Sequence, residues 1–364
     1  MALAEQLGLE TDSWCGSVFS SLYNNLTGLT QGFNKALTRP NETLPLWKIE
    51  DRYRVLFQMQ SALGLLFERV SASYDQSRRD WFFDTRAQNG NAVNYDRYGL
   101  GDLRDVELRF LDVLRLGGQT IDLLLTSSGM AAFQIIQQYL LHRLPAGSIV
   151  VLPPYIYFEA MELLQSLTHI QIQYAPTFKA EDKIATANLH NASVVFVDPV
   201  ANVVGLPPTD LRTFARIVTA SSGWSDRCVV VDGTMASGAM PVHDWFNGPT
   251  APKLLYYESA SKYLQFGLDV QMAGLVAYPA EMDMEMRTIR RNTGSVMYSR
   301  NASLLPPIDF VMYQTRMSLL TSNASRLSHQ LSMTLSPMVE CSFPTEWEQY
   351  GSSMGGDTEG RLSP

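Results

Sequence analysis

Residues 253–263 are Lys253-Leu254-Leu255-Tyr256-Tyr257-Glu258-Ser259-Ala260-Ser261-Lys262-Tyr263. The first half of this stretch, from Lys253 to Tyr257, is an apolar run that predicts a strand buried on both faces. The second half leaves the strand and places Lys262 among small, hydroxyl and aromatic residues, with no other base nearby. Residues that follow a strand in an α/β fold lie at the edge of the sheet where ligands bind. The stretch therefore predicts an α/β sheet with a distinctive lysine at its edge.

The segments around this stretch alternate between apolar runs and helical patterns. The apolar runs predict strands at Ile121–Leu125, Ile149–Leu152, His169–Tyr174, Ser193–Val197, Cys228–Val231, Leu254–Tyr257 and Met272–Ala277. Helices are predicted from Met130 to about His142, and at Phe158–Leu167, Thr209–Ala220 and Ala280–Arg291. This order predicts an α/β fold with a doubly wound, mostly parallel sheet and helices on both faces.

Both flanks of this region carry patterns of their own. An apolar stripe at helical spacing covers residues 53–70, and Asp102 is expected to cap a helix that runs to about Leu116. Residues 304–331 predict a long helix, and Met338–Phe343 predicts one strand.

Bulk properties narrow the classes of function. The chain has 364 residues, 46% of them hydrophobic and 18% charged, so a large core can form and wholesale disorder is excluded. The formal net charge of -8 argues against a nucleic-acid surface, and no apolar run reaches the ~18 residues of a membrane span. The three cysteines are far apart and the N-terminus lacks a signal-peptide pattern, so we expect a cytoplasmic protein.

A lysine and a carboxylate, each placed after a strand, predict a cofactor site. Lysine forms a Schiff base with pyridoxal phosphate, and Ser259 and Ser261 offer hydroxyls to the phosphate. Asp232 follows the strand Cys228–Val231, where a carboxylate can pair with a protonated pyridine nitrogen. Taken alone, Ser-x-Ser-Lys is a weak motif, and Asp232 equally fits a helix or turn cap.

The turn Ser127-Ser128-Gly129-Met130 predicts a phosphate site, because it lies at a strand end and opens a helix. Free N–H groups and the helix dipole attract a phosphate there, and the glycine lets the backbone approach it closely. An ordinary serine N-cap is the alternative interpretation.

Further candidates follow other strands or precede the sheet. Tyr157 can lie flat on a pyridine ring, with Tyr155 as its rival. Asn202 can donate to the cofactor's phenolate oxygen, although an asparagine in a turn is the alternative. Tyr95 and Arg97 place a phenol and a guanidinium in one loop, and arginine suits a bidentate grip on phosphate.

The order of these motifs resembles that of the cystathionine γ-synthase/γ-lyase family, the Cys/Met metabolism group of fold-type-I pyridoxal-phosphate enzymes. The motifs are Tyr-x-Arg-Tyr-Gly at 95–99, Ser-Ser-Gly-Met-Ala-Ala at 127–132, Asp-Gly-Thr at 232–234 and Ser-x-Ser-Lys-Tyr at 259–263. The resemblance extends to Asp269 and to Arg316-Met317 and Asn323-Ala324, so it covers about two-thirds of the chain.

The resemblance implies a role for each matching residue. Lys262 would carry pyridoxal 5'-phosphate and later move the proton, and Asp232 would pair with the pyridine nitrogen. Tyr157 would stack on the ring and act as an acid or base, while Asn202 would contact the phenolate oxygen. The phosphate would be held by Ser128, Gly129, Met130, Ser259 and Ser261. Tyr95 and Arg97 would reach the phosphate of a neighbouring subunit, which implies a homodimer or homotetramer with shared sites.

The chain also departs from the family pattern. Gly233 replaces an asparagine, Leu100-Gly101-Asp102 replaces Asn-Pro-Thr, and Phe266-Gly267-Leu268 replaces Gly-His-Ser. The arginine that normally grips the substrate α-carboxylate has no match, so we expect either a truncated gene product or a substrate held differently. The expected parts are an N-terminal helical arm with the cofactor-reaching loop at 1–101, a large domain at 102–297 and a partial C-terminal α+β domain at 298–364.

The resemblance implies β/γ-elimination or γ-replacement on a sulfur- or oxygen-substituted amino acid, with no nucleic acid, membrane or metal involved. An aminotransferase or a specialised-metabolism enzyme on the same fold is one alternative, because a fold does not fix a reaction. A truncated, non-catalytic protein that only binds the cofactor is the other.

Overall fold

The computed structural model describes residues 101–114, 121–237, 240, 242–267, 271–298, 301–302, 305 and 309–335. All of these belong to the second of two compact units, residues 96–364. The predicted stripe at 53–70, the strand at Met338–Phe343, and Tyr95 and Arg97 lie outside the described residues. The domain boundaries predicted at 101 and 297 stay predictions.

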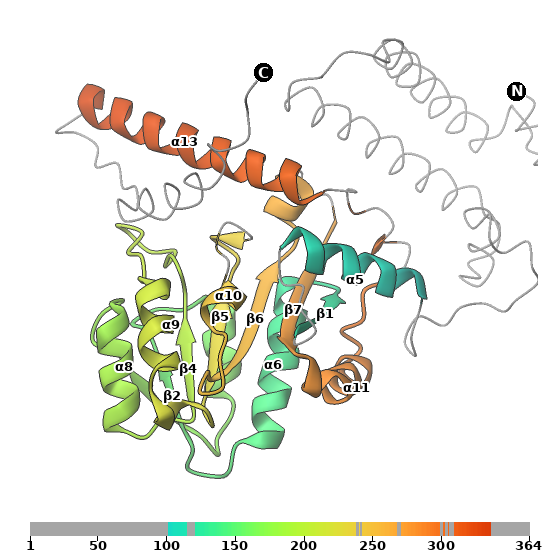
Figure 1. The fold of residues 1–364 in the computed structure, drawn as a ribbon, viewed down its shortest axis with the longest axis vertical. Helices are drawn as coiled ribbons and strands as arrows, with labels where there is room; N and C mark the ends of the chain where they lie inside the picture. The colour runs from blue at the N-terminus through green and yellow to red at the C-terminus, as the bar shows by residue number, and fades with distance from the viewer. Residues whose placement is uncertain are drawn as a thin grey trace, which may run out of the picture. The chain divides into compact units, whose positions relative to one another are not determined.

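A mostly parallel sheet forms the centre of the described part of the chain (Figure 1). Its strands are β1 (Ile121–Thr126), β2 (Ile149–Leu152), β3 (Gln171–Tyr174), β4 (Val194–Val197), β5 (Cys228–Asp232), β6 (Lys253–Ser259) and β7 (Gly274–Pro279). They lie side by side in the order β1-β7-β6-β5-β4-β2-β3. Strand β7 runs antiparallel to β1 and β6, and the other neighbours are parallel. The predicted fold class is confirmed.

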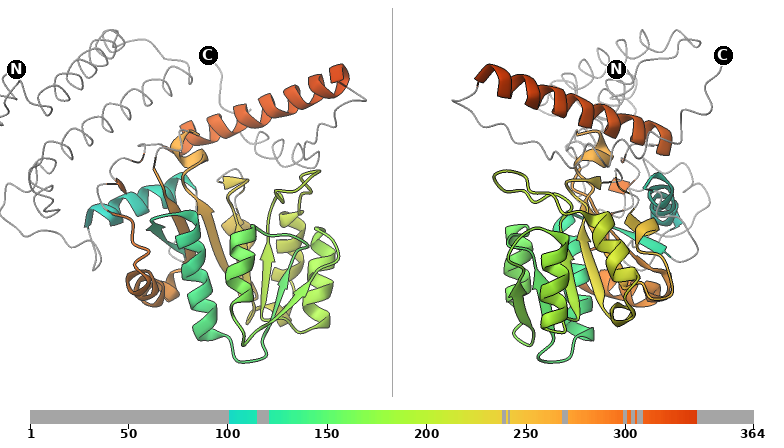
Figure 2. Two further views of the ribbon diagram at one scale, coloured as in Figure 1. Left: turned by 180° about the vertical axis from the view of Figure 1, so that it is seen from behind. Right: turned by 60° about the vertical axis from the view of Figure 1, so that its left-hand side comes forward.

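Helices cover both faces of the sheet, as the views in Figure 2 show. They are α5 (Gly101–Val113), α6 (Gly129–Arg143), α7 (Phe158–Gln165), α8 (Ala180–Leu189), α9 (Leu211–Thr219), α10 (Val242–Trp245), α11 (Asp283–Thr293) and α13 (Phe310–Leu335). Helix α6 packs on β6 and β7, while α8 packs on β2 and β4. Because both faces are covered, runs such as Val194–Val197 and Val229–Val231 are almost fully buried.

Several predicted boundaries were wrong for identifiable reasons. Helix α5 already includes Gly101 and Asp102, so Asp102 lies within the helix and not before it, and the helix ends at Val113. Helix α9 begins at Leu211 after its N-cap, Asp210, whose carboxylate accepts from Thr213 N at 2.8 Å. Thr209 precedes this N-cap and does not start the helix, and its N–H is bonded to Pro199 O. Helix α8 was not predicted at all.

A buried ion network attaches α5 and α11 to β1, which is an edge strand. Glu107 is fully buried and lies 2.5 Å from Arg290, with Glu107 Oε1 and Arg290 Nη1 as the nearest atoms. The same two side chains bond the outward backbone groups of one β1 residue: Leu125 N donates to Glu107 at 3.1 Å, and Leu125 O accepts from Arg290 at 3.0 Å. The network thus satisfies backbone groups that an edge strand would otherwise expose.

Candidate active site

Lys262 lies in the segment that connects β6 to a short 3-10 helix, Tyr263–Gln265, and its side chain is exposed. The segment is held by buried Gln265, whose amide donates to Ala260 O at 2.9 Å and to Gln271 O at 2.7 Å. Ser261 Oγ lies 3.3 Å from Ala273 O and accepts from Ala273 N at 3.2 Å. The backbone around the lysine is therefore fixed while its amine faces solvent.

The N-terminus of α6 lies against the same strand end. Ser128 is its N-cap, and Ser128 Oγ accepts from Ala131 N at 3.0 Å. A Cβ added to Gly129 would lie 3.0 Å from Ser259 Cα, so only glycine allows the helix start to approach β6 this closely. Among the described residues, the N–H groups of Gly129 and Met130 have no acceptor. Two backbone donors are thus available beside Ser259.

Asp232 ends β5, where it lies in register with Tyr257 of β6. Its carboxylate accepts from Thr234 N at 2.9 Å, and Thr234 Oγ1 in turn accepts from Ser259 N at 3.1 Å. Burial raises the pKa of Asp232, whereas hydrogen bonds from Thr234 and Tyr257 and the charge of Lys262 lower it. The structure therefore brings Asp232, Ser259 and Lys262 together.

A second carboxylate adjoins Asp232. Val197 of β4 pairs in register with Val231 of β5, so the next residues, Asp198 and Asp232, are neighbours across the two strands. Burial, and then the charge of Asp232, raise the pKa of Asp198 well above its ordinary value. Asp198 was not among the predicted site residues, although its position after a strand could have indicated it.

Tyr157 and Asn202 are less closely tied to this group. Tyr157 is 40% exposed, and its ring packs on Phe158 with 5.0 Å between ring centres. Burial, and then Glu159, raise the pKa of Tyr157, so its hydroxyl stays protonated at neutral pH. Asn202 is exposed in the loop that an isolated bridge between Val200 and Pro208 closes. Their predicted roles stay predictions.

A buried polar cluster behind the site was missed. Ser237 Oγ donates to Glu258 Oε1 at 2.9 Å and bonds the hydroxyl of Tyr313, while Tyr256 donates to Glu258 Oε2. The cluster also explains a departure from the family pattern, since a Cβ on Gly233 would lie 1.9 Å from the Tyr256 hydroxyl oxygen. No local motif could have indicated it, because its members come from distant parts of the chain.

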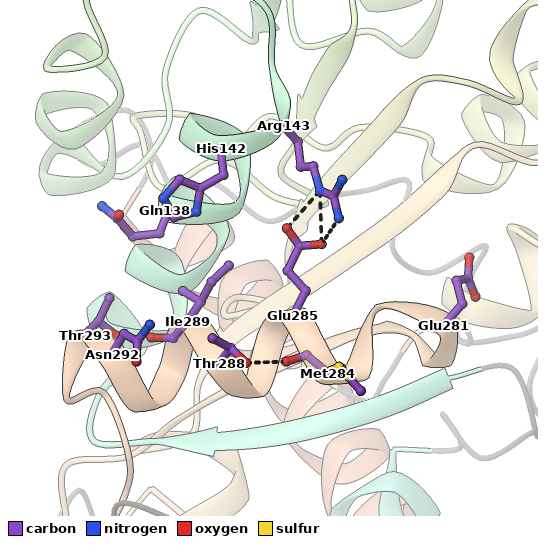
Figure 3. A pocket seen from close by; sticks show the side chains of 10 residues that line it. All are labelled: Gln138, His142, Arg143, Glu281, Met284, Glu285, Thr288, Ile289, Asn292 and Thr293. Atoms are coloured by element: carbon purple, nitrogen blue, oxygen red, sulfur yellow. Dashed lines mark hydrogen bonds and ion pairs between the residues drawn. The ribbon is translucent and has the colours of Figure 1, made fainter.

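A hollow of about 680 Å³ lies between the C-terminal half of α6 and α11 (Figure 3). It is crossed by Arg143 and Glu285, whose side chains form a bidentate pair with a shortest contact of 2.6 Å. Arg143 and Gly129 are the two ends of α6, which places them about 20 Å apart. The hollow is therefore separate from the candidate active site.

Two classes of site have no support in the described part of the chain. It contains no group of three or more His, Cys, Asp or Glu side chains arranged to hold a metal ion. Within the same residues, none of the helices has both the length and the apolar character needed to cross a membrane.

The residues at the strand ends fit pyridoxal phosphate. An exposed lysine amine can bond its aldehyde, a carboxylate can face its ring nitrogen, and two unbonded N–H groups at a helix N-terminus can take its phosphate. The donor set thus matches the reactive groups of the cofactor.

Comparison with known proteins gives three kinds of similarity. The family model described as "Cys/Met metabolism PLP-dependent enzyme" matches residues 68–343. The bifunctional enzyme flvA of Aspergillus flavus is 42% identical over 399 residues, which cover 98% of this chain and 48% of that protein. The chain thus spans about half the length of the curated relative it matches.

Two solved structures illustrate the likeness in fold. Cystathionine γ-lyase CalE6 from Micromonospora echinospora has a TM-score of 0.56 and 18% identity, covering 74% of this chain and 68% of that one. Cystathionine γ-synthase from Xanthomonas oryzae pv. oryzae, in complex with cystathionine, has a TM-score of 0.51 and 20% identity, with coverages of 67% and 59%. At these identities the likeness concerns the fold alone.

Proposed function

The chain belongs to the Cys/Met metabolism PLP-dependent enzymes, and from that premise we propose that it binds pyridoxal 5'-phosphate through Lys262. We further propose that it catalyses β/γ-elimination or γ-replacement on an amino acid with a sulfur or oxygen substituent. The observation that carries the proposal is the meeting of Lys262, Asp232 and the α6 N-terminus at one end of the sheet.

Each of these groups has a distinct task. The bound cofactor supplies an electron sink that acidifies the α-proton of the amino acid. Asp232 keeps a proton on the facing ring nitrogen, because a carboxylate stabilises a cation beside it. The N–H groups of Gly129 and Met130 bind the phosphate. The Lys262 amine would hold the cofactor and would serve as the base that moves a proton between substrate carbons, with the Tyr157 hydroxyl as a further acid.

Absorbance tests the cofactor. Purified protein incubated with pyridoxal phosphate should show a visible band that borohydride fixes onto the peptide containing Lys262. Lys262→Ala should lack the band, while Lys253→Ala, at the exposed start of the same strand, should keep it. A colourless wild-type protein would refute the proposal.

Product analysis tests the reaction. Incubation with thioether or O-acyl amino acids should release the thiol or carboxylic acid together with a keto acid and ammonia. With an added nucleophile such as a thiol, the leaving group should instead be exchanged for that nucleophile at the β- or γ-carbon. Stoichiometric transfer of the amino group to a keto acid would instead identify an aminotransferase, and a stable visible band without turnover would identify a protein that only binds the cofactor.

A further inference from the structure

Helix α13 lies over the end of the sheet where β5 and β6 finish (Figure 1). Two of its side chains, Tyr313 and Arg316, are almost fully buried, with 0% and 7% exposure. They are three residues apart, so they lie on the same face of the helix. This face makes two separate contacts with the candidate active site.

The first contact is a chain of hydrogen bonds. The Tyr313 hydroxyl bonds Ser237 Oγ, which donates to Glu258 Oε1 at 2.9 Å. Ser237 belongs to the turn that follows Asp232, where its N–H bonds Gly233 O. Glu258 lies on β6, four residues before Lys262 in the sequence. The chain therefore joins α13 to the segments that carry both central residues of the site.

The second contact holds the segment after the lysine. Arg316 Nη2 donates to Phe266 O at 2.8 Å, and its guanidinium carbon lies 5.5 Å from the centre of the Phe266 ring. Phe266 has φ of 56°, a left-handed conformation that a residue with a side chain rarely adopts. The next residue closes the loop, since Gly267 N bonds Lys262 O at 2.9 Å. Arg316 thus stabilises a strained turn whose other end is Lys262.

The charges around Glu258 connect this cluster to the site. Tyr256 bonds Glu258 directly, and Tyr313 is connected to it through Ser237. Glu258 also interacts with the charges of Asp232 and Lys262. The imidazole of His243, which lies against Tyr256 with 6.0 Å between ring centres, has a pKa lowered by burial to about 3 and is neutral. Burial raises the pKa of Glu258 to about 8. A change in this cluster therefore alters the field at Lys262.

We propose that Glu258, Tyr313 and Arg316 are positioning residues that fix the separation between the Asp232 carboxylate and the Lys262 amine. The expected effect on cofactor binding rests on the proposed function. The connection between α13 and the segments that carry Asp232 and Lys262 is itself a property of the protein without cofactor. Helix α13 sets the geometry of the site without touching its ligand.

Hydrogen exchange on the cofactor-free protein tests the link. Tyr313→Phe deletes one hydroxyl from the buried chain, and exchange of the amides at 233–237 and 259–267 should become about tenfold faster. Thr315→Val is the matched control, because it deletes an exposed hydroxyl of the same helix that bonds Val311 O, and it should leave both segments unchanged. Amide exchange rates in Tyr313→Phe that equal those of the wild type would overturn the proposal. If that variant does not fold, Ser237→Ala interrupts the same chain and is judged by the same criterion.

Cofactor titration of the full protein tests the consequence. Tyr313→Phe should bind pyridoxal phosphate about tenfold more weakly and shift the pH at which the visible band changes, whereas Thr315→Val should match the wild type. A lower melting temperature with an unchanged dissociation constant and pH midpoint would show a merely structural role and overturn the proposal. A wild-type protein without any band would refute the proposed function instead, and the exchange result alone would then decide the link.

Discussion

Lys183 shows how much a single buried amine can matter in this chain. It is fully buried on α8, where Nζ donates to Phe178 O and, at 3.0 Å, to Thr209 Oγ1. Burial lowers the pKa of Lys183 to about 8, even though Asp198 acts in the opposite direction. The folded protein therefore binds this proton more weakly than the unfolded chain does.

The pH dependence of stability should reveal this amine. Because the pKa of Lys183 falls from 10.5 to about 8 on folding, its contribution to stability is present above 10.5 and is lost as the pH falls through 8. Lys183→Met should be more stable than the wild type at pH 7, and the difference should shrink by roughly 3 kcal/mol by pH 10. Urea unfolding at both pH values measures this difference in the free energy of unfolding.

The matched control is Lys179→Met, an exposed lysine at the start of the same helix. Because the Lys179 side chain is exposed, its replacement should change the free energy of unfolding by less than about 0.5 kcal/mol. A constant difference for Lys183→Met would contradict the lowered pKa.

At the level of single residues, the sequence predicted which side chains come directly after a strand. Lys262, Asp232 and Gly129 were proposed as site residues because parallel strands bring their carboxyl ends to one edge. The structure places them at the same end of the sheet, and their roles stay predictions. The partners of Glu258 could not be predicted, since Ser237 is 21 residues from Glu258 and 76 from Tyr313, and hydrogen bonds over such distances leave no local pattern.

Among the secondary-structure elements, α5 and β1 depend on one buried carboxylate. Glu107→Gln would leave the Arg290 guanidinium without its buried counter-charge. We expect a loss of about 3 kcal/mol in the free energy of unfolding, measured by urea titration. Asp112→Asn, an exposed change on the same helix, should cost less than about 0.5 kcal/mol. Equal effects of the two changes would disprove the role given to the network.

Elements were predictable where hydrophobic periodicity was visible. The strands β2, β4 and β5 are continuous apolar runs and were found within a residue of their ends. Helix α8 was missed although it buries Ala180, Lys183, Ile184 and Ala187, which have helical spacing. Two of these residues are small and one is charged, so large apolar side chains do not recur at helical spacing and the pattern was not recognised. The antiparallel direction of β7 has no signal in its own sequence.

For the whole molecule, we propose a two-fold symmetric dimer in which Tyr95 and Arg97 of one subunit reach the cofactor phosphate of the other. Mixing Arg97→Ala with Lys262→Ala protomers should then restore activity. Half of randomly mixed dimers pair the two variants, and each recovers one of its two sites, so about a quarter of wild-type activity is expected.

Each variant alone is the control and should be nearly inactive. Differently tagged protomers should co-purify, which establishes that subunits have exchanged. Absence of recovery despite exchange would place both residues in the site of one subunit.

The pairing of β1 with β7 also bears on how the protein is made. The two strands align from Ile121 with Pro279 to Thr126 with Gly274, across about 150 residues of intervening chain. Strand β1 leads directly into the α6 N-terminus, so that end of the helix has no finished sheet to rest on until β7 has left the ribosome. At about 5–20 residues per second, synthesis of the intervening chain takes roughly 10–30 s. A nascent chain released before Pro279 would lack the partner of β1 and expose that apolar edge to chaperones.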